Sequence, residues 1–341
     1  MDLELLHKRA RIIHNVRSFF WGKEYLETDT PLLAPNLIPE SCLEVFETRR
    51  HSPIGSLIPE KSYWLIPSPE IWMKRLIRQH QTNLFQICKC FRNGEAIGRQ
   101  HNSEFTMLEY YTMHANYLDS LCLTEELFAF LLNPNHENQD YRTEKDSNCL
   151  TPPFIRISIE EAFWQWAGFD LFKTSAAYTD ASGAMEEEAI RLGLNPVSGL
   201  SVPELYDLIF IHVVEPKLKM ERPVALLDYP AFVPCLAKKS EDGKTVERWE
   251  LYIDGIELAN CFSEETNAEE VRRFFESEKA EKEKCALVKH DVDENYWKIF
   301  LPGKNSVTFP PCSGVAMGLD RLIMLLTGCS AIDGILPFPM E

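Results

Sequence analysis

The sequence predicts an α+β fold in which an antiparallel β-sheet is flanked by helices and carries a mainly helical insert. Two observations predict it. The elements follow the order helix, antiparallel strands, helical insert, strands, helix, and neither a G-x-x-x-x-G-K-[ST] nor a G-x-G-x-x-G fingerprint of a parallel nucleotide-binding sheet is present. The 341 residues, 45% hydrophobic and 26% charged, suffice for a large core, which excludes disordered and fibrous classes.

The charge balance and the cysteines restrict the class of function. The 52 acidic and 35 basic side chains give a formal net charge of -17, which repels nucleic-acid phosphates and disfavours generic nucleic-acid binding. None of the ten cysteines forms a Cys-x-x-Cys pair, so we expect reduced, mostly buried thiols. The N-terminus lacks the apolar core of a signal peptide and no membrane-length apolar run follows, so we expect a cytoplasmic protein without a membrane contact.

The first two elements are a helix and an extended segment. Apolar residues at helical spacing between Ile12 and Phe20 predict an amphipathic helix over residues 4–22. The chain then continues in an extended segment through Leu26 and Thr28.

A second helix and a long-looped hairpin come next. A capping serine, a first-turn proline and an acid that favours the helix dipole, Ser68-Pro69-Glu70, precede the helical run IWMKRLIRQH. The aromatic and β-branched runs Leu84–Arg92 and Glu104–Thr112 then predict an antiparallel hairpin, joined by the polar loop Asn93–Ser103.

The middle of the chain is predicted to be mainly helical. The polar stretch Asn133–Pro153 is the best candidate boundary, because it is typical of a surface excursion. Two capping boxes, Ser158-x-x-Glu161 and Ser201-x-x-Glu204, each lead an apolar helical run.

The last third returns to strands and ends in a helix. Trp249–Phe262 is predicted to be extended, and the charged run EEVRRFFESEKAEKEK to be helical. The segment SGVAMGLDRLIMLLTG predicts a strand that turns into a helix ended by Gly328.

The hairpin carries the first candidate site residues. Alternation gives one strand a polar face of Gln86, Cys88, Cys90 and Arg92, and the return strand a face of Phe105, Met107, Glu109 and Tyr111. An aromatic ring, a carboxylate and a phenol on one face can bind a purine and a cationic group. An ordinary half-buried hairpin with one solvated face explains the same alternation.

Two carboxylates in Trp249–Phe262 suggest a cation site. Strict alternation places Glu250 and Glu257 on opposite faces, but a β-bulge at Gly255 would return Glu257 and Ala259 to the face of Glu250. Two converging carboxylates need a compensating cation, and their hard oxygens suit Mg²⁺. A solvated strand edge is the alternative.

The final strand is rich in small residues. Gly314, Ala316 and Gly318 allow a ligand to approach the backbone closely. Arg321, at the start of the following helix, can meet a phosphate with both its own charge and the helix dipole, although an ordinary ion pair with a carboxylate fits equally well.

These segments, in this order, resemble the three signature motifs of class II aminoacyl-tRNA synthetases. Motif 1 corresponds to about 7–35, motif 2 to about 84–112 and motif 3 to about 312–328, with the helical insert at about 154–224. The resemblance implies the synthetase catalytic fold as one domain over residues 1–341. The runs SPEIWMKRL, HNSEFTMLEYY and GIELANCFSE resemble the lysyl branch in particular.

Motif 1 begins almost at Met1, so we expect no anticodon-binding OB-fold. This combination resembles the elongation factor P–(R)-β-lysine ligase family, which is paralogous to lysyl-tRNA synthetase. The resemblance implies that ATP, with Mg²⁺, activates lysine or (R)-β-lysine to an acyl-adenylate, which is transferred to a lysine of elongation factor P. It also implies a homodimer without stable tRNA binding. A truncated synthetase that activates α-lysine and a catalytically inactive regulatory paralogue are the alternatives.

The resemblance implies a role for each site residue. The catalytic residues would be Arg92, Arg321, Glu250 and Glu257, and the two glutamates would also bind the metal. ATP would be bound by Arg92, Asn93, Glu95, His101, Asn102, Phe105, Glu250, Leu251, Gly318 and Arg321. The lysine-like substrate would be bound by Ser68, Glu70, Glu109, Tyr111, Glu257, Asn260, Glu264 and Ala316.

Three positions distinguish this sequence from the synthetase pattern. Motif 2 reads Arg92-Asn93-Gly94-Glu95, one residue longer than Arg-x-Glu, and we favour Glu95 as the contact to adenine. Cys261 stands where the pattern has glycine, which we expect to add a side chain near the pocket. Ala316 also replaces a glycine, and its methyl group is expected to crowd the α-amino group of α-lysine and so to favour the β isomer.

Overall fold

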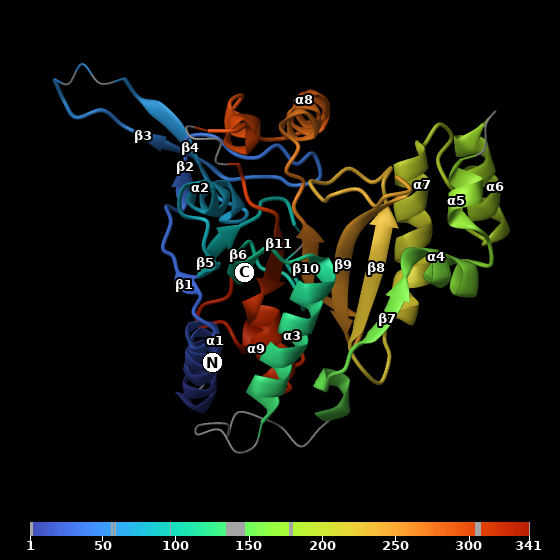
Figure 1. The fold of residues 1–341 in the computed structure, drawn as a ribbon, viewed down its shortest axis with the longest axis horizontal. Coiled ribbons are helices and arrows are strands. Elements are labelled where there is room, and N and C mark those ends of the chain that lie inside the picture. Colours follow the sequence, from blue (N-terminus) through green and yellow to red (C-terminus); the bar gives the residue numbers. More distant parts are fainter. Residues whose placement is uncertain are drawn as a thin grey trace. The chain divides into compact units, whose positions relative to one another are not determined.

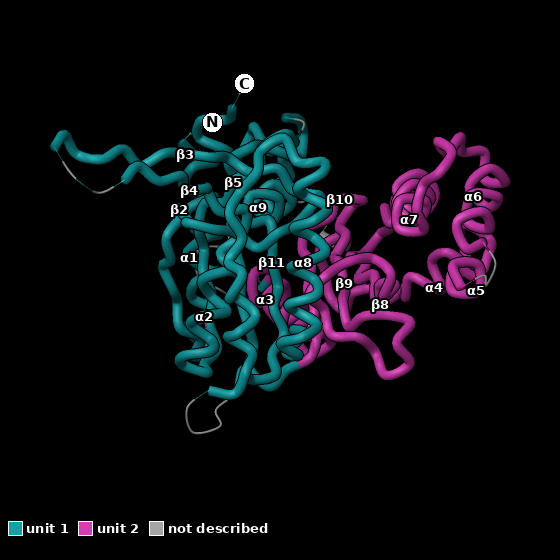
Figure 2. Tube along the Cα trace, turned by 90° about the horizontal axis from the view of Figure 1, so that it is seen from above, with its two compact units in different colours: residues 1–115, 133–143, 264–341 teal, residues 116–132, 144–263 magenta. Residues whose placement is uncertain are grey.

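Residues 3–55, 57, 59–95, 97–133, 147–176, 180–303 and 308–340 are described by the computed structural model. The chain forms two units (Figure 2), of which unit 1 comprises residues 1–115, 133–143 and 264–341 and unit 2 comprises residues 116–132 and 144–263. The single catalytic domain over 1–341 stays a prediction. Most of the predicted boundary Asn133–Pro153 lies outside the described residues.

Unit 1 combines the first third of the chain with its last part (Figure 1). Its helices are α1 (Leu3–Gly22), α2 (Glu70–His80), α8 (Ala268–Cys285) and α9 (Leu319–Thr327). Four strands that pair side by side follow the order β1 (Leu26–Glu27), β5 (Leu84–Phe91), β6 (Glu104–Met113) and β11 (Cys312–Gly318). The pair β1 and β5 is parallel and the others are antiparallel. A small sheet has the order β2 (Leu33–Ala34), β4 (Lys61–Leu65) and β3 (Glu47–Arg50).

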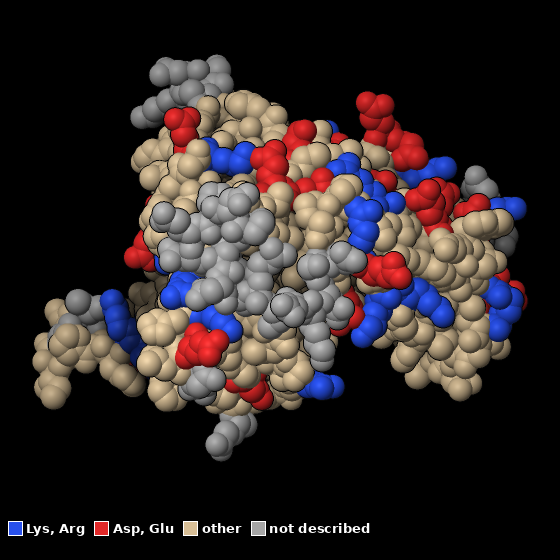
Figure 3. Space-filling view, turned by 90° about the horizontal axis from the view of Figure 1, so that it is seen from below, with Lys and Arg blue, Asp and Glu red and all other residues tan. Residues whose placement is uncertain are grey.

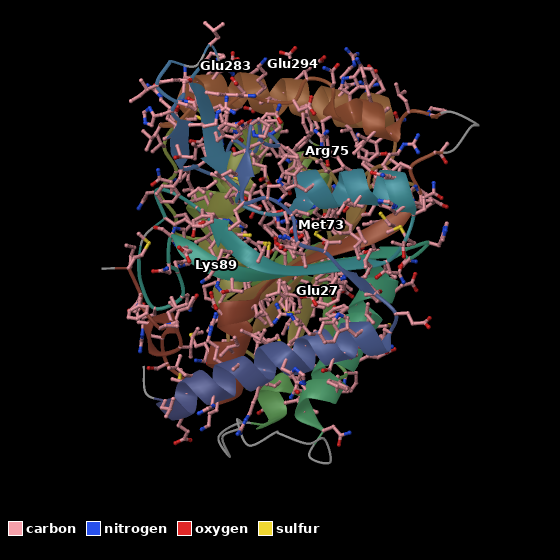
Figure 4. All side chains as sticks on the ribbon, turned by 90° about the vertical axis from the view of Figure 1, so that its left-hand side faces the viewer. Glu27, Met73, Arg75, Lys89, Glu283 and Glu294 are labelled. Atoms are coloured by element: carbon pink, nitrogen blue, oxygen red, sulfur yellow. The ribbon has the colours of Figure 1, made fainter. Side chains whose placement is uncertain are left out.

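Helices cover both faces of the β5–β6 pair in unit 1 (Figure 4). The helix α1 lies on one face, where Phe20 stacks on Phe85 with ring centroids 5.0 Å apart. The helix α2 lies on the other face, with the buried Met73 toward the strands and Arg75 toward α8. The face under α2 also carries Glu109, so α2 and β6 together build one side of the site.

Unit 2 holds the insert and the second group of strands. Its strands follow the order β10 (Ile256–Ser263), β9 (Thr245–Ile253), β8 (Val224–Pro230) and β7 (Ile155–Ser158), with only β7 and β8 parallel among the described pairs. Its α-helices are α3 (Tyr117–Leu132), α4 (Ile159–Ala162), α5 (Leu171–Ser175), α6 (Ala181–Arg191) and α7 (Val202–Ile209). Buried apolar residues of the insert pack against β8 and β9, which explains why this segment folds.

Most of the predicted elements are confirmed. The first helix, the hairpin of β5 and β6, both capping boxes, the charged helix α8 and the final strand and helix all form, and Gly328 ends α9 with a positive φ of 68°. The helix α2 begins one residue later than the capping pattern predicts. Pro69 is its N-cap residue, while the hydroxyl of Ser68 accepts the Glu70 N–H at 3.0 Å.

The predicted extended run Trp249–Phe262 is wrong in one respect, because it is two strands joined by a tight turn. Asp254 and Gly255 have φ values of 52° and 77°, which is the two-residue hairpin geometry that glycine favours. No helix in the described part of the chain is both long and apolar enough to cross a membrane.

Candidate active site

Four carboxylates and one lysine form a cluster in unit 1, which we call the carboxylate pocket. Its members are Glu40, Glu70, Lys74, Glu109 and Glu264. Glu70 begins α2, Glu109 lies on β6, and Glu264 is the residue directly after β10. These acids come from distant parts of the sequence, which is typical of a binding site.

Lys74 is the cation that pairs directly with two acids of the carboxylate pocket, while Arg92 and Lys282 act on Glu40 at its edge. Its Nζ lies 2.5 Å from Glu70 Oε1 and 2.5 Å from Glu264 Oε2, and its side chain is 1% exposed. Burial by itself would lower the pKa of Lys74, but Glu264 and Glu70 beside it raise that pKa well above its usual value. Lys74 therefore stays charged and holds two of the four carboxylates.

Glu109 is bound by neutral donors instead. Ser68 Oγ donates to its Oε2 at 2.9 Å, and Tyr111 Oη donates to its Oε1 at 2.7 Å. These hydroxyls fix the carboxylate without neutralising it, so Glu109 can still bind a cation.

Burial weakens the ionisation of three of these acids. It raises the pKa of Glu109 and of Glu264 to about 8, and that of Glu40 to about 7, and in each case the nearby Glu70 raises the pKa further. A cationic ligand would reverse this effect, so the pocket favours ligands with ammonium groups. Glu40 and Glu70 also line a small surface cleft with Leu37, Ile38, Pro67, Ser68 and Ile71.

The strand β11 forms a tight wall of the pocket. A Cβ atom on Gly314 would lie 2.5 Å from Tyr111 Cε1 and 2.7 Å from Glu264 Oε1, so only glycine fits there. Ala316 is paired with Glu109 in the ladder, and its methyl group therefore lies on the face of that carboxylate. This register supports the predicted place of Ala316 beside the substrate.

The predicted nucleotide residues of unit 1 gather near the end of β5 and the start of α9. The Arg92 guanidinium lies 5.3 Å from the centroid of the Phe105 ring and 3.5 Å from Glu95. Arg321 contacts His101, with Nη2 and Nε2 2.8 Å apart. Burial lowers the pKa of His101, and so do the charges of Arg321 and Arg92, so the imidazole is neutral and both arginines face one region. Gly318 is the residue that joins β11 to α9.

A buried network on the other side of β6 fixes these residues. Arg9 of α1 lies 2.6 Å from Asp320 and donates to Thr106 Oγ1 at 3.0 Å, and the Thr106 N–H donates to Asp320 at 2.6 Å. Thr106 follows Phe105 and Asp320 precedes Arg321. The network therefore sets the backbone of both predicted nucleotide residues.

Asn93 and Asn102 make structural contacts that motif matching did not reveal. Asn93 Nδ2 donates to Val45 O at 3.3 Å. Asn102 Oδ1 accepts the Met340 N–H at 3.0 Å, while its Nδ2 donates to Glu104 O at 2.5 Å. Both amides fasten the motif 2 loop, so their predicted contact with ATP stays a prediction.

Glu250 in unit 2 lies in a buried polar cluster. Tyr229 Oη and Tyr252 Oη donate to its Oε2 at 2.6 Å and 2.7 Å, and Arg248 Nη2 pairs with its Oε1. Arg248 also stacks over the Tyr229 ring at 4.5 Å. Burial by itself would lower the pKa of Arg248, but Glu250 raises it above the usual value, so the guanidinium stays charged.

Glu257 and Asn260 share the face of Glu250. In the ladder Glu257 is paired with Tyr252, and Asn260 is paired with Glu250. Because Tyr252 and Glu250 share a face of β9, the two predicted metal ligands, Glu250 and Glu257, lie on one face. The predicted position of the β-bulge is wrong, because the register shifts between Glu257 and Ala259 and not at Gly255. The predicted return of Ala259 to this face is also wrong, because Ala259 is paired with Leu251.

Two further predictions on this hairpin concern residues of the face opposite Glu250; the contact of Leu251 with ATP stays a prediction. Leu251 is buried on the face opposite Glu250, so any contact with ATP must use its backbone. Cys261 is paired with Trp249 and fully buried on that same opposite face. Alternation thus directs the Cys261 thiol into the core and away from the Glu250 face. The prediction that the Cys261 side chain lies near the pocket is therefore wrong.

The residues of unit 2 fit a Mg²⁺ ion that takes part of its ligands from the protein. Glu250 and Glu257 supply hard carboxylate oxygens on one face, and Mg²⁺ commonly completes its shell with water and phosphate oxygens. Within the described ranges, no group of three or more His, Cys, Asp or Glu side chains could hold a metal by itself.

Three residues of these clusters escaped the sequence analysis. Lys74 could have been found, because it lies four residues after Glu70 on one helix face. Arg248 could have been found from alternation with Glu250. Glu40 lies in a loop before β3 and had no local signal.

Comparison with known proteins gives consistent matches. The family model of class II tRNA synthetases (D, K and N) matches residues 3–341. The chain is 33% identical over 341 residues to a protein of Haemophilus influenzae (strain PittGG) named elongation factor P--(R)-beta-lysine ligase, covering 100% of this chain and 96% of that one. A protein of Pasteurella multocida (strain Pm70) with the same name is also 33% identical, with the same coverage. A third of this name, from Hamiltonella defensa subsp. Acyrthosiphon pisum (strain 5AT), is 34% identical over 339 residues, 98% of this chain and 95% of that one.

Proposed function

This chain belongs to the class II tRNA synthetase family (D, K and N), and from that membership we propose that it is an ATP-dependent ligase of the elongation factor P–(R)-β-lysine ligase group. It activates a lysine, with (R)-β-lysine preferred, to an acyl-adenylate. It then transfers the acyl group to a lysine ε-amine of elongation factor P. Relatives that carry this name over their whole length support the proposal.

The carboxylate pocket is the observation that carries the proposal. The pocket has four carboxyl groups, and Lys74 forms ion pairs with two of them, Glu70 and Glu264. The surplus of carboxyl groups over paired cations matches a substrate with two ammonium groups, whose charges would favour the ionised form of these acids, and an amino acid with a single amino group does not offer two. Glu109 is held ready by Ser68 and Tyr111 to accept one of them.

The two steps follow from residue types and need no protein nucleophile. In the first, a carboxylate oxygen of lysine bonds to the α-phosphorus of ATP, and the bond to pyrophosphate breaks. Arg92 and Arg321 would neutralise charge on the phosphates, and Phe105 would stack on adenine. In the second, the ε-amine of the acceptor bonds to the acyl carbon, AMP leaves, and the amine loses a proton.

Mg²⁺, when bound, screens the phosphate charge, and Glu250 and Glu257 would hold it. Arg248, Tyr229 and Tyr252 fix the orientation of Glu250, so it is already in place before a ligand binds. This fixed arrangement lowers the cost of organising the site.

The charge of the chain supports a protein acceptor. A formal charge of -17 disfavours stable binding of tRNA. On the face shown in Figure 3, basic side chains are interspersed with acidic ones and do not form an extended basic surface. Elongation factor P takes part in translation, so the proposed place of the reaction is the cytoplasm.

Exposed apolar side chains in motif 1 and in the few residues before it support a homodimer. Between residues 3 and 33 they are Leu3, Leu6, Trp21, Leu26, Leu32 and Leu33. A group of this size on one segment is typical of a subunit interface.

ATP–pyrophosphate exchange tests the activation step. We expect exchange with lysine isomers, highest for (R)-β-lysine, and none with leucine or glutamate. Arg92→Ala and Arg321→Ala should each lower exchange by about a hundredfold or more, because each removes a charge where negative charge develops. Exchange that does not depend on a lysine isomer, or that persists in both folded variants, would contradict the proposal.

A further inference from the structure

Three sulfur atoms lie side by side on the β5–β6 pair of unit 1. Cys88 Sγ is 3.8 Å from Cys90 Sγ, and Cys90 Sγ is 4.0 Å from Met107 Sδ. Cys88 is directly opposite Met107 in the ladder, so all three side chains share one face. We call this group the sulfur cluster.

The sulfur cluster lies between the two parts of the proposed site in unit 1. Along the same face, Glu109 is the next residue of β6 on one side of Met107, and Phe105 is the next on the other. Cys90 is completely buried and Met107 is 4% exposed, while Cys88 is half-buried. An ion can therefore reach the cluster through Cys88.

From this geometry we propose that Cys88, Cys90 and Met107 bind one Cu(I) ion. Two thiolates and a thioether are the soft ligands that select Cu(I) among biological metals. Metal–sulfur bonds of about 2.3 Å would place the three sulfurs of a trigonal site about 4.0 Å apart. The two spacings at Cys90, 3.8 Å to Cys88 and 4.0 Å to Met107, match that value, and the ladder places Cys88 directly opposite Met107.

The charges near the sulfur cluster are compatible with this ion. Binding converts two thiols and Cu(I) to a complex with one net negative charge and releases two protons. Burial, together with the neighbouring Cys88 and Glu109, raises the pKa of the Cys90 thiol well above the usual value, and the charge of Arg92 lowers it. Metal coordination deprotonates such thiols outright.

Zinc is a poorer occupant for this cluster. A structural zinc site takes four ligands in a tetrahedron. No group of three His, Cys, Asp or Glu side chains that could hold a metal occurs in the part of the chain that the structure describes, and the third donor here is a methionine. A three-sulfur set with one thioether therefore favours the monovalent ion.

Titration of the reduced full chain with Cu(I) under anaerobic conditions, against a chromogenic Cu(I) chelator, tests the site. We expect wild type to take one equivalent from the chelator with release of two protons. Cys88→Ser should weaken this binding by about 100-fold and Met107→Leu by about tenfold, since each removes one ligand. Thermal unfolding of each variant confirms that it folds.

Cys42→Ser is the matched control, because Cys42 is an exposed thiol outside the cluster. It should leave the tight equivalent unchanged. Binding that is equal in wild type, Cys88→Ser and Met107→Leu, or that disappears with Cys42→Ser, would overturn the inference. A second arm rests on the proposed function: one equivalent of Cu(I) should abolish exchange in wild type but not in Cys88→Ser. If Cu(I) binds as expected but does not abolish exchange, the inhibition is refuted and the titration still supports the metal site.

Discussion

Replacing Lys74 by methionine removes the cation that pairs with two acids of the carboxylate pocket and keeps the side chain about the same length. Lys74 Nζ pairs with Glu70 and Glu264 at 2.5 Å each, and the side chain is 1% exposed. The buried carboxylate of Glu264 and the half-buried carboxylate of Glu70 are then left without their counter-charge.

The cost follows from burial. Removing one partner of a buried ion pair costs about 3–5 kcal/mol, because the remaining charge stays buried. Lys238→Met is the matched control, since Lys238 pairs with Glu247 at 2.8 Å but its side chain is 58% exposed. Such an exposed pair contributes less than about 1 kcal/mol. The two variants should therefore differ by at least about 2 kcal/mol in the free energy of unfolding.

Urea unfolding and exchange kinetics measure both effects. We expect the KM for the lysine substrate to rise by about tenfold in Lys74→Met, because Glu70 and Glu264 lose their fixed positions, and the KM for ATP to change less than about twofold. A structural role alone would move both constants together. Equal destabilisation in Lys74→Met and Lys238→Met, or an equal rise of both KM values, would refute the assigned role of Lys74.

Three further predictions concern the same pocket. Ala316→Gly should raise the specificity constant for α-lysine relative to (R)-β-lysine by about tenfold, as for one methyl group in a pocket, and an unchanged ratio would contradict the role of Ala316. Gly314→Ala should weaken lysine binding and lower stability by about 1–3 kcal/mol, because its Cβ would overlap Tyr111 and Glu264; a melting temperature and a Kd equal to those of wild type would count against this. The pH dependence follows from Glu109 and Glu264, whose pKa burial raises to about 8. Burial favours the neutral forms of both acids in the ligand-free protein. Their contribution to the free energy of unfolding is fully present below the pKa that each acid has in the unfolded chain, and it is lost as pH rises toward about 8. Thermal stabilisation by lysine should therefore grow between about pH 6 and pH 8.5, and a flat profile would show that neither acid titrates on binding.

Sequence reasoning worked best where a local rule controls the structure. Alternation placed Glu109 and Phe105 on one face, and the ladder of β5 and β6 confirms it. The capping boxes form because each uses contacts within four residues. Gly328 ends α9 for the same local reason.

Sequence reasoning failed where the result depends on contacts between distant residues. Glu257 lies on the face of Glu250, as predicted, but for a different reason. Asp254 and Gly255 form the turn of the hairpin, and the register shift lies after Glu257. Glu40 reaches the pocket from a loop that no short pattern identifies. The use of Asn102 by the C-terminal segment depends on a contact across more than two hundred residues, which no motif encodes.

Intact-mass analysis of elongation factor P tests the central proposal most directly. Purified factor would be incubated with the enzyme, ATP, Mg²⁺ and (R)-β-lysine, with Arg321→Ala enzyme and bulk tRNA as parallel reactions. We predict that the factor gains the mass of one lysyl group on a single lysine, that the variant leaves it unchanged, and that tRNA is not charged. A factor that stays unmodified while tRNA becomes charged would contradict the proposal and assign the chain to lysine activation for tRNA.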